Sequence, residues 1–187
     1  MNKTRIGLLV TVFAIGIIVF FAYFSYKKDA ITEDNAVATQ VQEVLMKDLE
    51  KNYPPTPKEV VKFYSEISKC YYNETYTEEE LDQMAHKMWS LFDKELQENN
   101  PEEQYLYDLK LDIQDFHENN YKISSYSPSS STDVEYYKDN GRECAKLYCT
   151  YTMRNGGAFS TTKEVFILRK DTETEHWKIL GFNVAVE

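Results

Sequence analysis

The sequence is poor in cysteine, with three in 187 residues, which are too few and too scattered for a disulfide scaffold or a zinc site. An odd count leaves at least one thiol unpaired in a monomer. Cys144 and Cys149 lie five residues apart, so on a regular strand they face opposite sides of a sheet and cannot pair with each other. Two alternatives stay open: a bridge from Cys70 to Cys144 or Cys149 if the domain lies outside the cell, or buried free thiols.

The sequence also lacks the motifs that identify common enzyme chemistries. It has no Walker phosphate loop, no GxGxxG nucleotide fingerprint and no G-x-S-x-G nucleophile elbow. Its three histidines, His86, His117 and His176, show no metal-ligand spacing. We therefore expect no catalytic residue, no cofactor and no metal.

Basic residues are scarce relative to acidic ones, with 21 Lys and Arg against 31 Asp and Glu and a formal net charge of −10. Residues 1–28 hold four of the cations and no acid, so the rest of the chain is more acidic still. Such a surface repels nucleic-acid phosphates, and we expect no nucleic-acid partner. The acids are spread through predicted helices and turns, which is typical of a solvated face.

Charged residues are absent from Ile6 to Tyr26, a run of 21 residues. A helix of about 20 residues crosses the roughly 30 Å hydrocarbon core of a bilayer, and Tyr23 and Tyr26 lie where aromatic rings favour the membrane interface. The run is longer than the apolar core of a signal peptide, about 7–15 residues, and does not end in small residues. We therefore expect a transmembrane anchor with basic flanks over 1–28, with the lipid bilayer as its partner.

The orientation of this anchor is less strongly specified, because two cations flank the run on each side. Acids contribute little to the positive-inside rule, and long domains cross the membrane largely regardless of charge. We expect the N-terminus inside and the domain outside, which gives a single-pass protein of the cell membrane with an extracytoplasmic domain.

The region after the anchor has a helical pattern. Thr32 can cap a helix that runs to about Lys51, and we expect residues 29–52 to form a helical stalk. The segment Asn52-Tyr-Pro-Pro-Thr-Pro57 then breaks the helix, since three prolines in four residues cannot continue it. The domain proper is predicted over 53–187.

Three helix starts follow, each with a capping residue and an acid three positions later. They are Thr56-Pro-Lys-Glu59, Thr77-Glu-Glu-Glu80 and Asn100-Pro-Glu-Glu103. Apolar residues then recur at helical spacing, which predicts one buried face per helix. The predicted buried residues are Val60, Phe63, Tyr64, Ile67 and Tyr71, then Leu81, Met84, Ala85, Met88, Leu91 and Phe92, then Leu106, Leu109, Ile113 and Phe116.

The pattern changes to period two over 143–154, where alternate residues from Ala145 to Met153 are apolar or aromatic. This predicts an antiparallel strand with one buried face, bounded by hairpin turns at 139–141 and 155–157. Further strands are expected at 121–126, 134–138, 158–169 and 176–186. Helices followed by consecutive antiparallel strands predict an α+β domain with three helices on one face of a curved sheet.

This order, with an ending of Trp177-Lys-Ile179 and Phe182, resembles the nuclear-transport-factor-two-like cone fold over about 56–187. The stretches Tyr53–Val60 and Glu143–Arg154 resemble an uncharacterised family of bacterial membrane-anchored proteins. Cone-fold proteins include dehydratases, isomerases and non-catalytic binders, and members with one N-terminal span also occur as assembly subunits of bacterial secretion machines. The resemblance therefore implies a fold and a location but no activity.

Four residues are candidates for a ligand pocket inside such a cone. Tyr64 and Tyr151 are expected to line it, and Asp112 flanks the apolar face of the third helix. Glu164 falls on the strand face that carries Phe166, so we expect it to point inward. The alternative is that the tyrosines belong to the core and the acids to the surface.

Three functions are compatible with these expectations. The first is a membrane-tethered extracytoplasmic domain that binds a protein partner or a small ligand without catalysis. The second is a structural subunit of a cell-envelope assembly, with contacts to other proteins or to copies of itself as a homo-oligomer. The third is a cone-fold enzyme of the dehydratase or isomerase type, which would need an acid or base of tuned pKa inside the pocket.

Overall fold

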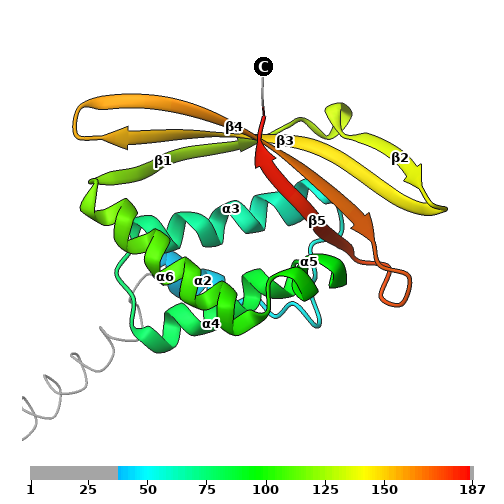
Figure 1. The fold of residues 1–187 in the computed structure, drawn as a ribbon, viewed down its shortest axis with the longest axis horizontal. Helices are drawn as coiled ribbons and strands as arrows, with labels where there is room; N and C mark the ends of the chain where they lie inside the picture. The colour runs from blue at the N-terminus through cyan, green and yellow to red at the C-terminus, as the bar shows by residue number, and fades with distance from the viewer. Residues whose placement is uncertain (1–37, 186–187) are drawn as a thin grey trace, which may run out of the picture. The chain divides into compact units, whose positions relative to one another are not determined.

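The computed structural model describes residues 38–185, and from Thr39 onward they form one compact α+β unit. Its helices are α2 (Gln40–Met46), α3 (Pro57–Asn73), α4 (Glu78–Ser90), α5 (Lys94–Asn99) and α6 (Glu102–Glu118). Its strands are β1 (Tyr121–Pro128), β2 (Glu135–Asp139), β3 (Arg142–Asn155), β4 (Ala158–Lys170) and β5 (Trp177–Val184), with a short 3-10 turn, η1 (Ser131–Asp133), before β2. These helices lie on one side of an antiparallel sheet (Figure 1), so the predicted α+β class is confirmed, although residues 38–185 form five helices where the sequence predicted three in the domain.

The predicted anchor of residues 1–28 lies outside the described residues. Within 38–185, no helix combines the length and the apolar character that crossing a membrane requires.

Strand β3 organises the sheet. One of its edges pairs with β2 near its start and with β1 near its end, and the other edge pairs with β4 from Cys144 to Asn155. Strand β5 then adds to the second half of β4. The register shifts once where β1 pairs with β3, between Ile123 and Ser125, and once where β5 pairs with β4, opposite Ile167 and Leu168. The extra residue lies in β1 in the first case and in β5 in the second, and such bulges bend and twist a strand.

The hairpin turns form where the sequence predicted them. Asn140 and Gly141 both have positive φ, 47° and 79°, as a two-residue turn between right-twisted strands requires. Gly156 has a φ of 56° in the turn between β3 and β4, where Asn155 pairs with Ala158. These two turns fix the register of the three strands that they join.

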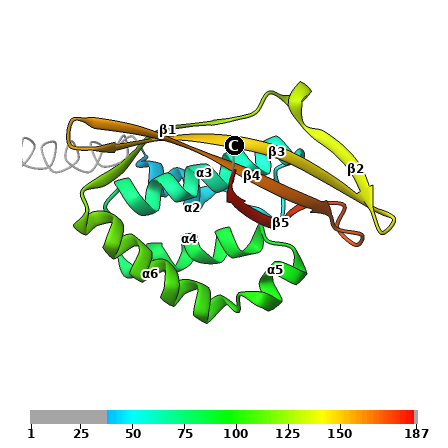
Figure 2. The ribbon, with the colours of Figure 1, turned by 45° about the horizontal axis from the view of Figure 1, so that its top comes forward.

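The core surrounds α3, between this helix and the sheet on one side and between it and the other helices on the other. Figure 2 shows α3 directly beneath the strands, with α4 and α6 farther from the sheet. In β3, Ala145, Leu147, Cys149 and Tyr151 are buried, as predicted, and Met153 is partly buried. The predicted faces of α3 and α4 are buried except for Tyr64, which is partly exposed, and on α6 Leu109 and Ile113 are buried while Leu106 and Phe116 are only partly so. The largest buried side chains include Phe63, Ile67, Tyr71, Met84, Met88, Leu147, Phe166, Leu168 and Ile179. Each contributes roughly 1.5–3 kcal/mol of transfer free energy by leaving water.

The predicted stalk is wrong in its described part. Helix α2 has seven residues, begins in a capping box between Thr39 and Gln42, and ends where Lys47 adopts an extended conformation. Its Val41 and Val44 are buried in the domain core, so the helix is packed against the domain. An isolated helix of this length would not be stable in water, which is why tertiary contacts decide its extent. Residues 29–37 of the predicted stalk lie outside the described residues.

The predicted capping by Asn100 is also wrong, and α5 was not predicted. Asn100 ends α5, and its side-chain amide donates to the Leu96 carbonyl at 2.9 Å. Helix α6 starts after Pro101 with no side-chain cap. The six residues of α5 include no buried side chain, so the sequence has no apolar periodicity that would predict this helix.

The outer edge of β5 is partly covered by the segment after α4. Asp93 N–H donates to the Ile179 carbonyl, and Ile179 N–H donates to the Leu91 carbonyl, both at 2.8 Å. Asp93 is 3% exposed, and its carboxylate accepts from Arg169 Nε at 3.0 Å. Burial opposes ionisation of Asp93, but the bonds from Arg169 and the backbone N–H of Glu95 hold its pKa below the usual range. The acid therefore stays ionised and fixes α5 to the sheet.

The free edge of β1 is covered by a side chain instead of a strand. The Asn73 amide donates to the Ile123 carbonyl at 2.7 Å and accepts from the Ile123 N–H at 2.9 Å. Ile123 is buried, so its backbone groups would otherwise lack full access to water. The two bonds tie the end of α3 to the sheet.

The change Asn73→Ala should lower the free energy of unfolding by about 1–2 kcal/mol, because it removes both partners of Ile123. Urea denaturation of the full chain in a mild detergent measures this. Asn99→Ala, at the exposed end of α5, is the matched control and should change stability by less than about 0.5 kcal/mol. Equal effects of the two variants would show that the Asn73 amide does not stabilise the sheet edge.

Candidate functional site

A pocket of about 230 Å³ lies between α3, α6 and the inner face of the sheet. Its lining residues are Tyr64, Ser68 and Tyr72 from α3, Asp112 and Phe116 from α6, Ile123 from β1, Tyr151 and Met153 from β3, and Thr162 and Glu164 from β4. All four residues that the sequence singled out, Tyr64, Asp112, Tyr151 and Glu164, are among them. The sequence did not single out Tyr72, Phe116 or the two small polar side chains as pocket residues.

Regular spacing brings these residues together. On α3 the lining residues are four apart, which places them on one helix face. In the sheet, Tyr151 pairs with Thr162, and Glu164 pairs with Cys149 two positions along the same face. The alternation of β3 and β4 therefore directs Tyr151 and Glu164 toward α3.

Tyr151 is held rigidly in the wall of the pocket. Ser65 on α3 donates its hydroxyl proton to the Val61 carbonyl at 2.8 Å, so the Tyr151 hydroxyl donates to Ser65 Oγ at 2.7 Å. Burial raises the pKa of Tyr151 well above its ordinary value. Its phenol therefore stays protonated at neutral pH and acts as a fixed wall of the pocket.

Tyr72 and Asp112 form a second fixed pair at the more exposed side of the pocket. The Tyr72 hydroxyl donates to Asp112 Oδ2, and the Tyr72 ring lies 4.3 Å, centroid to centroid, from Phe116. Burial, and then the neighbouring Asp112 carboxylate, raises the pKa of Tyr72 above its usual range. The proton stays on Tyr72, and the carboxylate stays exposed with one oxygen engaged.

Glu164 differs from every other group in the pocket. It is half-buried, and within residues 38–185 no hydrogen bond or salt bridge reaches its carboxylate. Burial raises its pKa. Beside it, the Tyr64 ring packs edge-on against Phe166 at 5.1 Å. A desolvated acid without a partner, in a cavity walled by fixed rings, is typical of a functional site.

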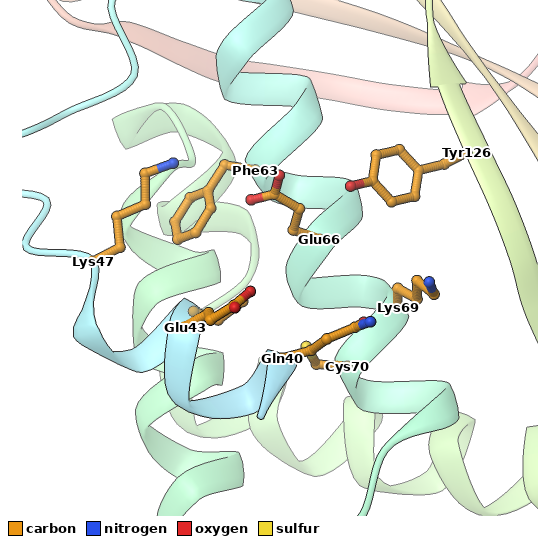
Figure 3. A pocket seen from close by; sticks show the side chains of 9 residues that line it. Gln40, Glu43, Lys47, Phe63, Glu66, Lys69, Cys70 and Tyr126 are labelled. Atoms are coloured by element: carbon orange, nitrogen blue, oxygen red, sulfur yellow. The ribbon is translucent and has the colours of Figure 1, made fainter. Parts of the chain in front are cut away.

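A second hollow of about 300 Å³ lies between α2, α3 and β1 and was not predicted. Figure 3 shows Glu43, Glu66 and Lys69 around it, with the Tyr126 ring directed toward α3. Lys47 Nζ lies 4.0 Å from the centre of the Phe63 ring. Because both signs of charge line this hollow, its walls largely neutralise one another, and it selects for a ligand charge less strongly than the first pocket does.

The thiols are free and buried, and of the two alternatives left open by the sequence the structure shows this one. Burial raises the pKa of Cys70 to about 11, so it is a thiol at neutral pH and a poor nucleophile. Within the described part of the chain, no group of His, Cys, Asp and Glu side chains is placed to hold a metal ion.

The change Glu164→Gln should raise the melting temperature by a few degrees at pH 7 and leave it nearly unchanged at pH 4. Because burial raises the pKa of Glu164, the folded chain binds its proton more readily than the unfolded chain, so stability falls as pH rises through this range. Thermal denaturation of the full chain at both pH values measures the effect. Glu98→Gln, on the exposed side of α5, is the control, and a loss of stability at pH 7 for Glu164→Gln alone would contradict the argument.

Comparison with known proteins places the chain in a family. No curated protein matches it. A family model described as a domain of unknown function, DUF6715, matches residues 1–182. The match spans almost all of the 187 residues, including the uncharged N-terminal run and the whole pocket, and it confirms the expectation of an uncharacterised family. The chain belongs to the DUF6715 family.

Proposed function

We propose that this protein is a membrane-tethered binding protein. Residues 6–26 anchor it in the cell membrane, and the domain, outside the cytoplasm, binds a small ligand in the pocket between α3, α6 and the sheet without catalysis. One observation carries the proposal above all: Glu164 is desolvated and has no partner among residues 38–185, in a pocket whose other side chains are fixed by contacts of their own.

The form of the pocket supports binding. Its walls come from α3, α6, β1, β3 and β4, so its shape depends on the packed core and not on loops. The hydrogen bond from Tyr151 to Ser65 and the bond from Tyr72 to Asp112 hold two of its walls in place. A preorganised pocket binds with little loss of side-chain entropy.

The arrangement also supports the cone-like fold that the sequence resembles. Helix α3 runs beneath the inner face of the sheet (Figure 2), and the register shifts in β1 and β5 are of the kind that bends strands. We propose that the domain is a cone whose interior is filled by the core at one end and left open, as the pocket, at the other.

The anchor should place the full chain in the membrane fraction of cells, resistant to extraction by carbonate. A chain that begins at residue 29 should be released from that fraction, because the uncharged run from Ile6 to Tyr26 is then absent. Protease added to intact, wall-stripped cells should degrade the domain if it lies outside. A full chain recovered in the soluble fraction would contradict the anchor. A domain that is degraded only after lysis would contradict the proposed orientation.

Filling the pocket should abolish ligand binding without unfolding the domain. Thr162 lines the pocket, whereas its neighbour Thr161 points to the opposite face of β4. Thr162→Tyr should therefore lose the thermal stabilisation that a small-molecule panel gives the wild type, which scales with ligand concentration over Kd.

Thr161→Tyr is the matched control for this experiment and should keep the stabilisation. Both variants put the same aromatic residue on the same strand, so a difference between them reports the pocket face alone. Equal stabilisation of both variants would place binding outside the pocket.

A second candidate function is that of a dehydratase or isomerase, and the raised pKa of Glu164 is the observation that favours it. A general acid or base works best when its pKa lies near the working pH. If Glu164→Gln still binds a compound that the wild type converts, but no longer converts it, the result would support the enzyme over the non-catalytic binding protein.

A further inference from the structure

We infer that the pocket takes a small organic cation, such as a primary or methylated ammonium compound. This inference rests on the proposed function, since it names the ligand class of the same site. Its basis is the combination of two carboxylates and four aromatic rings around one cavity.

The charge of the lining has one sign. Asp112 and Glu164 contribute carboxylates, and no Lys, Arg or His is among the lining residues of this pocket. Two nearby cations are engaged elsewhere: Lys163 lies 4.4 Å from the centre of the Tyr148 ring on the outer face of the sheet, and Lys110 Nζ pairs with Glu78 at 2.9 Å. A ligand with a positive charge is therefore attracted and an anion repelled.

The rings favour the same ligand. Tyr64, Tyr72, Phe116 and Tyr151 line the cavity, and the faces of aromatic rings attract cations, the more so where both are desolvated. These rings are already fixed, Tyr72 against Phe116 at 4.3 Å and Tyr64 against Phe166 at 5.1 Å. A cation needs little rearrangement of the walls to reach them.

Desolvation decides between a cation and a neutral molecule. Any ligand that fills the pocket removes the remaining water from Glu164. A neutral apolar ligand leaves the carboxylate buried and unpaired, which is strongly unfavourable, whereas a cation supplies the missing counter-charge. The volume of about 230 Å³ lies below the roughly 300–1,000 Å³ of sites for drug-sized ligands, so the cation is a single small molecule and not a peptide or a lipid.

Calorimetry on the full chain in a mild detergent tests this with matched probes. Choline is compared with its neutral carbon isostere dimethylbutanol, and benzylammonium with benzyl alcohol and benzoate. We expect each cation to bind at least tenfold more tightly than its neutral counterpart, a difference of about 1.4 kcal/mol. Benzoate should not bind.

Variants and pH identify the group responsible. Glu164→Gln should weaken binding of the cations at least tenfold and strengthen binding of the neutral probes, because no buried charge is then left unpaired, while Glu98→Gln should have no effect. The other titratable groups that face Glu164 are Asp112, the hydroxyls of Tyr64, Tyr72 and Tyr151, and the thiol of Cys149, its partner on β3. Cation affinity should fall as pH drops and the Glu164 carboxylate gains a proton, and this dependence should largely vanish in Glu164→Gln.

The outcomes separate the two proposals. Neutral isosteres that bind as tightly as the cations, and lose binding in Thr162→Tyr, overturn the cation inference and support a small-ligand pocket. Cation binding that is unchanged in Glu164→Gln overturns the inference, because the charge would then be recognised elsewhere. If no probe binds at millimolar concentration, the inference is wrong, and the small-molecule panel with Thr162→Tyr alone decides whether the pocket binds anything.

Discussion

The structure depends on the packing of α3 against the inner face of the β3–β4 hairpin. That hairpin is long, and its alternation commits one face to burial from Ala145 onward. Helix α3 covers this face with Tyr64, whose ring packs edge-on against Phe166. It also places two small residues, Ser65 and Ser68, toward it, each bonded to the carbonyl four residues earlier. A larger apolar side chain at Ser68 would extend the core into the space that is now pocket. The packing that stabilises the fold therefore also sets the depth of the cavity.

The sequence predicts this part of the structure well because the relevant signals are local. A period of two on β3 and β4 determines that Tyr151 and Glu164 share the inner face, and helical spacing places Tyr64 opposite them. The turn residues, such as Asn140 with Gly141, fix the register, and register decides which face each side chain occupies. Three of the four predicted pocket residues follow from face assignment alone. The place of Asp112 in the pocket depends, in addition, on the packing of α6 beside α3.

The parts that the sequence did not predict are set by partners far away in the chain. Helix α2 ends at Met46, where Lys47 is extended and its carbonyl accepts from Lys87 Nζ at 2.7 Å, 40 residues away, and nothing within the segment marks that end. Asp93 is fixed by Arg169 across 76 residues, and Asn73 replaces a strand partner for Ile123 across 50. The residues after Asn100 are typical of a helix start, which predicted Asn100 as an N-cap. Asn100 instead ends α5, which occupies the residues before it. In each case a tertiary contact overrides or completes a local preference.

Two acids associated with the sheet show how differently the chain treats carboxylates. Asp93 is more deeply buried than Glu164, yet its pKa is lowered, because Arg169, a backbone N–H and the more distant Arg142 compensate the loss of water. Glu164 lies only five residues before Arg169 on the same strand, has no such compensation within the described residues, and its pKa is raised. Of these two carboxylates, the arginine on β4 therefore neutralises that of Asp93 and not that of Glu164. An uncompensated carboxylate lowers the stability of the folded chain, and such a cost is tolerated where function requires it. The missing counter-charge is the feature that a bound cation would supply.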